Sequence, residues 1–302
     1  MVKPGKDYQP VIIIGAPRSG TNMLRDVLTA IDGVNTWPCD EINYIWRYGQ
    51  ASNPVDEFTA EDVNKKNKTY IRKQFNKLQR KTGSDYVVEK TCANSLRVDF
   101  VEEIIPEARY IFLFRNPVDV VTSARKRWKA SLDLLYILKK ARFVPLKDVP
   151  YYAVKYLWNR VYKLFSSQER LAFWGPKFKG MYEELDRESS VERICALQWK
   201  KCAETSLQVL RNLNRDRVHA VAYENFVFNP ENKLKRMLDW MEINKDDLDV
   251  SSLVADVSTA SVEKGYDKLD EETIAMVEDI TWNVYEEIIE EFDREVKTYG
   301  SS

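Results

Sequence analysis

The first residues with a recognisable chemical pattern are Gly15–Asn22 (GAPRSGTN), a loop that follows the apolar run Val11–Ile14. The run predicts a buried strand, and apolar residues at helical spacing after the loop predict a helix. A loop between a strand and a helix turns backbone N–H groups towards one point, which favours phosphate or sulfate. Its two glycines have P-loop spacing, but Thr21 replaces the lysine of a magnesium nucleotide site. The strong cation of the loop is Arg18, whose planar guanidinium can hold a terminal phosphate without a metal.

A second cation follows another predicted strand, Arg109–Phe114. Arg115 stands directly after this strand, and Ser123 lies eight positions later on a predicted helix. An NTPase would place a magnesium-binding aspartate at such a strand end. Ligands of open α/β sheets lie beyond the carboxyl ends of the strands, so we expect Arg18 and Arg115 at one edge. Two separated anion sites without a metal aspartate predict a nucleotide that carries phosphate at both ends of its ribose, and no bound metal.

Strands alternate with helices along most of the chain, which predicts a parallel α/β sheet with right-handed crossovers. Further strands are expected at Tyr86–Val88 and Val218–Tyr223, and helices at about 96–105, 118–128, 191–209, 230–241 and 270–297. The alternation lapses between about residues 130 and 190, a stretch rich in aromatic residues, where we expect a mostly helical insertion. The fold class is therefore α/β, a P-loop-type parallel sheet flanked by helices, in a single domain over residues 1–302.

Composition narrows the classes of partner. The 302 residues carry 46 basic and 47 acidic side chains, and the net charge of −1 argues against a protein built to coat nucleic acid or an anionic membrane. No apolar run is longer than five residues, so we expect neither a membrane span nor a signal peptide. The four cysteines lack CxxC pairing and are expected to be reduced, which favours a cytoplasmic location. The single histidine, His219, falls in a predicted strand and leaves little material for histidine-based catalysis or metal sites.

The two anion-binding motifs, in this order, resemble those of the sulfotransferase superfamily that uses 3′-phosphoadenosine-5′-phosphosulfate (PAPS). Pro17–Thr21 (PRSGT) resembles its 5′-phosphosulfate loop, and Arg115–Ser123 (RNPVDVVTS) resembles its 3′-phosphate element. Glu89–Thr91 and Tyr223–Phe226 are similar to further family segments. The resemblance implies PAPS as co-substrate, with no metal, bound by a set of eight residues: Pro17, Arg18, Ser19, Gly20, Thr21, Asn22, Arg115 and Ser123.

The resemblance also suggests the catalytic groups. Arg18 is similar to the arginine of tyrosylprotein and many bacterial enzymes, which, like the heparan sulfotransferases, place a catalytic glutamate shortly after the first helix. Glu41 falls in that stretch, and Asp40 is the alternative. Adjacent residues point apart in helices and strands, so we expect only one of the two carboxylates to face the site. Glu41 would accept the proton, Lys90 would stabilise charge, and Arg18 would hold the phosphosulfate. The cytosolic enzymes' late Arg-Lys-Gly element is missing, and Lys264–Gly265 is its candidate substitute.

The class of acceptor can be inferred only from the branch of the family that the motifs resemble. The bacterial-type loop and the heparan-like carboxylate favour a hydroxyl of a carbohydrate or small molecule, with a tyrosyl peptide as an alternative. A magnesium-dependent P-loop nucleotide kinase and a binding protein without turnover are the other two hypotheses. Structural salt bridges would explain Glu41 and Lys90 without catalysis, and packing would explain the aromatic insertion.

Overall fold

The computed structural model describes residues 8–128, 142–145, 148–151, 154, 174–187 and 189–292. Most of the predicted aromatic insertion, about residues 130 to 190, lies outside these residues. The last residues of the predicted helix 270–297 lie outside them as well.

The core of the fold is a five-stranded sheet in the order β2-β3-β1-β4-β5. Every neighbouring pair of strands is parallel. The strands are β1 (Gln9–Ile14), β2 (Val34–Asn35), β3 (Tyr86–Lys90), β4 (Arg109–Phe114) and β5 (Val218–Ala222). The predicted α/β class and parallel sheet are therefore confirmed, whereas the two-residue β2 was not predicted because two residues leave no periodic pattern.

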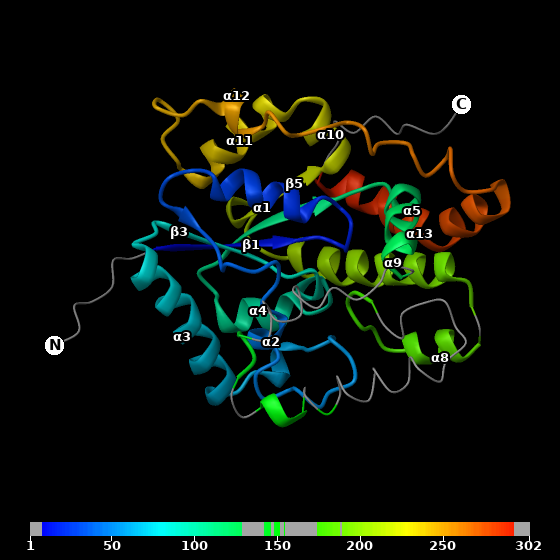
Figure 1. The fold of residues 1–302 in the computed structure, drawn as a ribbon, viewed down its shortest axis with the longest axis horizontal. Helices are drawn as coiled ribbons and strands as arrows, with labels where there is room; N and C mark the ends of the chain where they lie inside the picture. The colour runs from blue at the N-terminus through cyan, green and yellow to red at the C-terminus, as the bar shows by residue number, and fades with distance from the viewer. Residues whose placement is uncertain are drawn as a thin grey trace.

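Helices cover both faces of the sheet (Figure 1). The amino-terminal half contains α1 (Thr21–Thr29), α2 (Asn43–Trp46), α3 (Lys65–Thr82), α4 (Val98–Ile104) and α5 (Pro117–Trp128). The carboxyl-terminal half contains α8 (Met181–Asp186), α9 (Val191–Leu210), α10 (Tyr223–Phe228), α11 (Pro230–Met241), α12 (Val250–Leu253) and α13 (Glu271–Phe292). Short 3₁₀ turns span Ala60–Asp62, Cys92–Leu96 and Arg215–Arg217.

Alternating side chains of the strands pack into two hydrophobic cores, one on each face of the sheet. Val11 and Ile13 of β1 pack with α1, α10, α11 and α12 on one face. Ile12 and Ile14 pack with α3, α4, α5, α9 and α13 on the other. Figure 1 shows α1 and α10–α12 above the sheet and α4 and α9 below it. Because β1 is covered on both faces and flanked on both edges, it fixes the loop that follows it within a rigid frame.

The remaining predictions for single residues have simple outcomes. His219 is a strand residue of β5, and burial followed by the charge of Lys233 lowers its pKa to about 4. The four cysteines are free thiols. Tyr223, expected at a strand end, begins α10 instead. Among the described residues, no helix is both long and apolar enough to cross a membrane.

Candidate active site at the carboxyl ends of the strands

The loop between β1 and α1 has a backbone that few side chains tolerate. Arg18 has a φ of 72° and Gly20 a φ of 92°, both in the left-handed region. A Cβ on Gly20 would lie 2.4 Å from the ring of Tyr223, so only glycine fits there. The loop leads into α1, whose first turn carries no acidic residue. The first N–H groups of a helix lack intrahelical partners and favour an anion, so this backbone is suited to hold one.

The loop meets the end of β4 through its arginine. The Nε of Arg18 donates to the Oγ of Ser123 at 2.9 Å. The Nη1 of Arg115 donates to the carbonyl oxygen of Arg18 at 3.1 Å. Burial, together with the charges of Arg127 and Arg115, lowers the pKa of Arg18. The structure thus brings Arg18, Arg115 and Ser123 together, and like charges gather around the guanidinium of Arg18.

Arg115 is nearly enclosed, with 5% of its surface exposed. Its guanidinium carbon lies 4.3 Å from the ring centre of Tyr223, and its Nη2 donates to the carbonyl oxygen of Ser261. The same nitrogen lies 3.6 Å from the carboxylate of Asp119. These partners come from α5, α10 and the segment before α13. Sequence reasoning missed Ser261, whose position in a loop without a motif gives no signal, and it gave no role to Asp119 at i+4 from Arg115.

Carboxylates and a lysine meet at the ends of β2 and β3. The side chain of Lys90 is 1% exposed, and its Nζ lies 3.2 Å from Glu41 Oε1 and 3.5 Å from Asp40 Oδ1. Burial alone would lower the pKa of Lys90, but the negative groups around it, Glu41 foremost, outweigh burial and raise that pKa. Lys90 is therefore held as a cation between two carboxylates.

The expectation that Asp40 and Glu41 point apart is wrong, because both reach Lys90. Residues 38–42 form a bend rather than a helix or strand, so neither periodicity applies. The other partners of the two carboxylates differ. Arg25 donates to both the carboxylate and the carbonyl oxygen of Asp40, whereas Glu41 Oε1 accepts from the backbone N–H of Cys92 at 3.2 Å.

A buried hydrogen-bonded link holds the Glu41 segment against β3. Thr91 Oγ1 donates to Glu89 Oε1 and accepts from the backbone N–H of Ile42 at 3.2 Å. Asn94 donates to the other oxygen of Glu89 at 2.8 Å. Burial raises the pKa of Glu89 to about 7, although the hydrogen bond from Thr91 opposes the shift. The residue next to Glu41 is thus tied to the end of β3 through one hydroxyl group.

Comparison with known proteins adds to this geometry. Residues 10–142 match the model of a family described as the sulfotransferase family. This segment, which is less than half of the chain, is similar to that family. The match contains most of β1, the Arg18 loop, the carboxylates, Lys90 and the Arg115 element, so the family resemblance seen in these motifs is confirmed. A comparison with curated protein sequences gives no match.

Solved sulfotransferases share the fold. The sulfotransferase domain from the curacin biosynthetic pathway is 15% identical, with a TM-score of 0.50 over 91% of this chain and 98% of that domain. Sulfotransferase STF9 from Mycobacterium avium is 10% identical, with a TM-score of 0.53 over 96% of this chain and 78% of that protein. At identities this low, the structural likeness shows that the fold is shared and nothing more.

Buried polar atoms at the site of this sulfotransferase fold fit an anionic ligand. Within the described residues, the Oγ of Ser19 and the Nε of Arg115 are buried and have no hydrogen-bond partner. Ser19 is fully enclosed in the loop after β1, and Arg115 follows β4. Buried polar groups without partners are costly, so two donors at neighbouring strand ends mark a place suited to ligand oxygens.

Lys264 and Gly265 lie at the same end of the fold. The backbone N–H of Gly265 donates to Asp119 Oδ1 at 2.7 Å, which places this pair at the first turn of α5, close to Arg115. The side chain of Lys264 is exposed.

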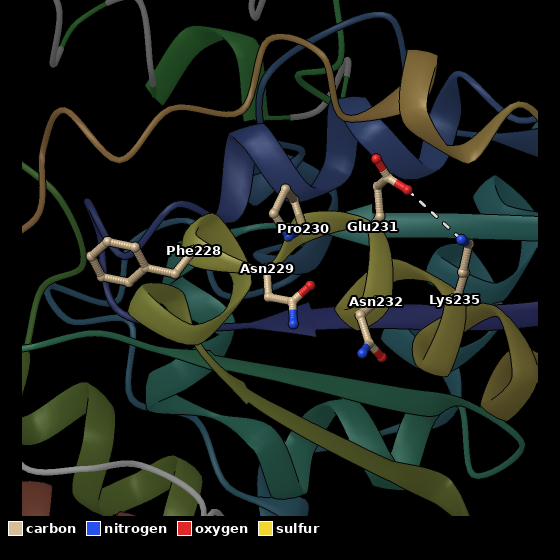
Figure 2. A pocket seen from close by; sticks show the side chains of 6 residues that line it. All are labelled: Phe228, Asn229, Pro230, Glu231, Asn232 and Lys235. Atoms are coloured by element: carbon tan, nitrogen blue, oxygen red, sulfur yellow. Dashed lines mark ion pairs between the residues drawn. The ribbon is translucent and has the colours of Figure 1, made fainter.

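A hollow of about 500 Å³ at the junction of α10 and α11 is separate from this site (Figure 2). It is lined by Phe228, Asn229, Pro230, Glu231, Asn232 and Lys235. Glu231 and Lys235 face each other across 3.7 Å as an ion pair. None of the predicted site residues contributes to its lining.

Proposed function

We propose that the protein transfers a sulfuryl group from PAPS to a hydroxyl group of an acceptor. The observation that carries the proposal is the arrangement at one edge of the sheet. Two linked arginines follow β1 and β4, and a carboxylate–lysine cluster follows β2 and β3. The two arginines are suited to bind an anionic donor, and a carboxylate of the cluster is suited to accept the proton of a hydroxyl acceptor.

Donor binding divides between the two strand ends. Pro17–Asn22 would hold the 5′-phosphosulfate through backbone N–H groups, with Arg18 as the cation. Because Ser123 takes the Nε of Arg18, the terminal nitrogens of Arg18 are the ones that would meet the phosphosulfate. Arg115 and Ser123 would bind the 3′-phosphate, and Lys264–Gly265 would add donors beside Arg115. Charge-assisted hydrogen bonds from planar guanidinium groups suit both phosphates.

Transfer needs a base, a cation and an aligned acceptor. The acceptor oxygen forms a bond to sulfur while the bond from sulfur to the 5′-phosphate oxygen breaks, and the bisphosphate leaves with that electron pair. Both carboxylates contact Lys90. Glu41 would take the hydroxyl proton, since its side chain is longer than that of Asp40. Lys90 and Arg18 would stabilise the charge that develops on the leaving oxygen.

The acceptor class follows from the same carboxylate. A glutamate after the first helix resembles the heparan enzymes, which supports a carbohydrate or small-molecule hydroxyl, and a tyrosyl peptide is the alternative. We further propose that residues 1–302 act as one sulfotransferase domain.

Calorimetry tests the donor. We expect adenosine 3′,5′-bisphosphate to bind, and ATP with magnesium and NAD to bind far more weakly. The matched control is Arg217→Ala, which removes an arginine paired with Glu102 at the start of β5, away from the carboxyl ends of the strands, and should leave binding unchanged. Tight binding of ATP with magnesium, together with activity lost in excess chelator, would favour the kinase hypothesis instead. Binding of the bisphosphate without turnover on any acceptor would favour a binding protein.

A further inference from the structure

A segment far along the chain is fastened to the first turn of α5 by one carboxylate. Asp119 Oδ2 accepts from the backbone N–H of Glu263 at 2.8 Å, and its Oδ1 accepts from that of Gly265 at 2.7 Å. Asp119 is 3% exposed, so these hydrogen bonds are shielded from water. Both oxygens of one buried side chain therefore determine where residues 261–265, here called the late loop, lie.

The late loop fits α5 and Arg115 closely. A Cβ on Gly265 would lie 2.7 Å from the carbonyl carbon and oxygen of Val118, so the backbone of the loop lies directly on the helix start. Glu263 takes a left-handed φ of 59°. The hydroxyl of Ser261 lies 2.7 Å from that of Tyr223, the residue that stacks on Arg115. Such a fit leaves little freedom to shift without breaking several contacts.

Asp119 also touches the cation of the 3′-phosphate element. Its Oδ2 lies 3.6 Å from the Nη2 of Arg115, and that nitrogen donates to the carbonyl oxygen of Ser261 in the late loop. A buried negative charge beside Arg115 opposes the binding of an anion there. If the site served only to attract an anion, a carboxylate beside Arg115 would weaken it. The location of Asp119 is therefore better explained by the backbone and side-chain groups that it holds in place.

We propose that Asp119 is a positioning residue that makes nucleotide binding depend on the 3′-phosphate, by holding Arg115 and the late loop with Lys264 in one fixed arrangement. The inference rests on the proposed function, since it concerns the same donor site. In this proposal Asp119 holds Arg115 and the late loop rather than the nucleotide itself. Without it, Arg115 and the loop that carries Lys264 would no longer be fixed against each other.

Calorimetry with two probes tests this role, because adenosine 3′,5′-bisphosphate and adenosine 5′-monophosphate differ only in the 3′-phosphate. We expect Asp119→Asn to reduce the preference for the bisphosphate by about tenfold, with the affinity for the monophosphate changed by less than about twofold. Lys264→Ala should weaken bisphosphate binding in the wild-type background and have little further effect in the Asp119→Asn background. Such coupling in a double-mutant cycle reports action through the loop rather than a loss of stability.

Two further variants separate position from folding. Asp56→Asn is the matched control, since Asp56 is also a buried carboxylate that accepts a distant backbone N–H, that of Lys177, and pairs with an arginine. It should lower the melting temperature and keep the preference. Gly265→Ala leaves Asp119 intact but displaces the loop from Val118, so it should reproduce the loss of preference even if Asp119→Asn fails to fold.

The outcomes are distinct. A preserved preference in Asp119→Asn or, where that variant does not fold, in Gly265→Ala overturns the inference alone, as do additive effects of Asp119→Asn and Lys264→Ala. Equal binding of the two probes by the wild-type protein overturns the proposed function, and the inference with it.

Discussion

The two halves of the site treat positive charge in opposite ways. At the ends of β2 and β3, Lys90 lies between the carboxylates of Glu41 and Asp40, so its charge is balanced. At the ends of β1 and β4, Arg18 meets a hydroxyl and the nearby Arg115, so positive charge accumulates around Arg18, whereas the carboxylate of this half, Asp119, lies beside Arg115. The pKa values move accordingly. Burial and neighbouring arginines lower the pKa of Arg18, whereas the negative groups around Lys90, Glu41 foremost, overcome burial and raise its pKa.

This difference assigns chemistry to each half. Accumulated positive charge near the start of a helix favours an anionic ligand, because the ligand relieves repulsion among the cations. A carboxylate–lysine cluster whose charge is balanced is suited to move a proton, and its lysine can stabilise charge that develops during the transfer. The two halves share one edge, which under the proposed function would let a donor held in one react with an acceptor activated in the other.

The largest expected effect is on the carboxylate half. Glu41→Gln keeps the shape of the side chain but cannot accept a proton, so we expect turnover to fall by roughly 10²- to 10⁴-fold. The affinity for adenosine 3′,5′-bisphosphate should be nearly unchanged, because Arg18 and Arg115, the residues proposed to hold its phosphates, lie in the other half. Turnover is measured by single-turnover sulfation of an acceptor selected from a library of carbohydrates and phenols. Affinity is measured by calorimetry.

Asp40→Asn is the matched variant, since it shares Lys90 but is tied to Arg25. Its turnover should fall less. If Glu41→Gln turned over at the wild-type rate and Asp40→Asn did not, the role of base would pass to Asp40.

The next largest effect is on the arginine half. Arg18→Ala removes charge-assisted contacts, so we expect affinity for the bisphosphate to fall by roughly 10- to 100-fold. Arg115→Ala should weaken binding of the bisphosphate more than binding of the 5′-monophosphate. Titration of both ligands measures these affinities, with Arg217→Ala as the arginine control. Equal losses for both ligands in Arg115→Ala would indicate a folding defect rather than phosphate recognition.

A smaller effect concerns the buried acid under the carboxylate half. The pKa of Glu89 is raised to about 7 in the folded protein from a usual value of 4.5, so its contribution to stability is fully present below pH 4.5 and is lost as pH rises through 7. Urea unfolding between pH 5 and 8 should show a decline of up to about 1.4 kcal/mol per pH unit that is absent in Glu89→Gln. Parallel pH profiles for the two proteins would contradict the raised pKa.

The smallest effect tests the link from Glu89 to the Glu41 segment. Thr91→Val removes the hydroxyl that donates to Glu89 and accepts from Ile42. Because only the bond to Ile42 reaches the Glu41 segment, we expect turnover to fall about three- to tenfold, the worth of that one neutral hydrogen bond. Thr91→Ser should restore most of it. Thr281→Val is the control, because it deletes an equally buried hydroxyl that bonds within α13. A rate unchanged in Thr91→Val would show that the link does not place Glu41.

Much of the sheet could be predicted from the sequence because continuous apolar runs such as Val11–Ile14 have few other uses in a chain of this composition. The Arg18 loop and Arg115 were also predictable, since each directly follows such a run and parallel strands end at one edge. These features depend on neighbours along the chain.

What could not be predicted depends on residues far apart in the chain. No local pattern pairs Asp119 with Gly265, 146 positions away, or places Ser261 against Arg115. The convergence of Asp40 and Glu41 was missed because it needs an irregular bend, for which side-chain periodicity gives no rule.

The strand order has a consequence for how the protein is made. β1 lies in the middle of the sheet yet is synthesised first, and its two neighbours, β3 and β4, begin only at Tyr86 and Arg109. On the ribosome, the apolar segment Val11–Ile14, almost fully buried in the finished protein, therefore has both hydrogen-bonding edges open until β3 is added at Tyr86–Lys90, and one edge open until β4 is added at Arg109–Phe114. Open edges of apolar strands pair with other chains. Nascent chains halted before Phe114 should thus be the aggregation-prone species in the cell, and chaperones that bind extended apolar segments should engage this protein at β1.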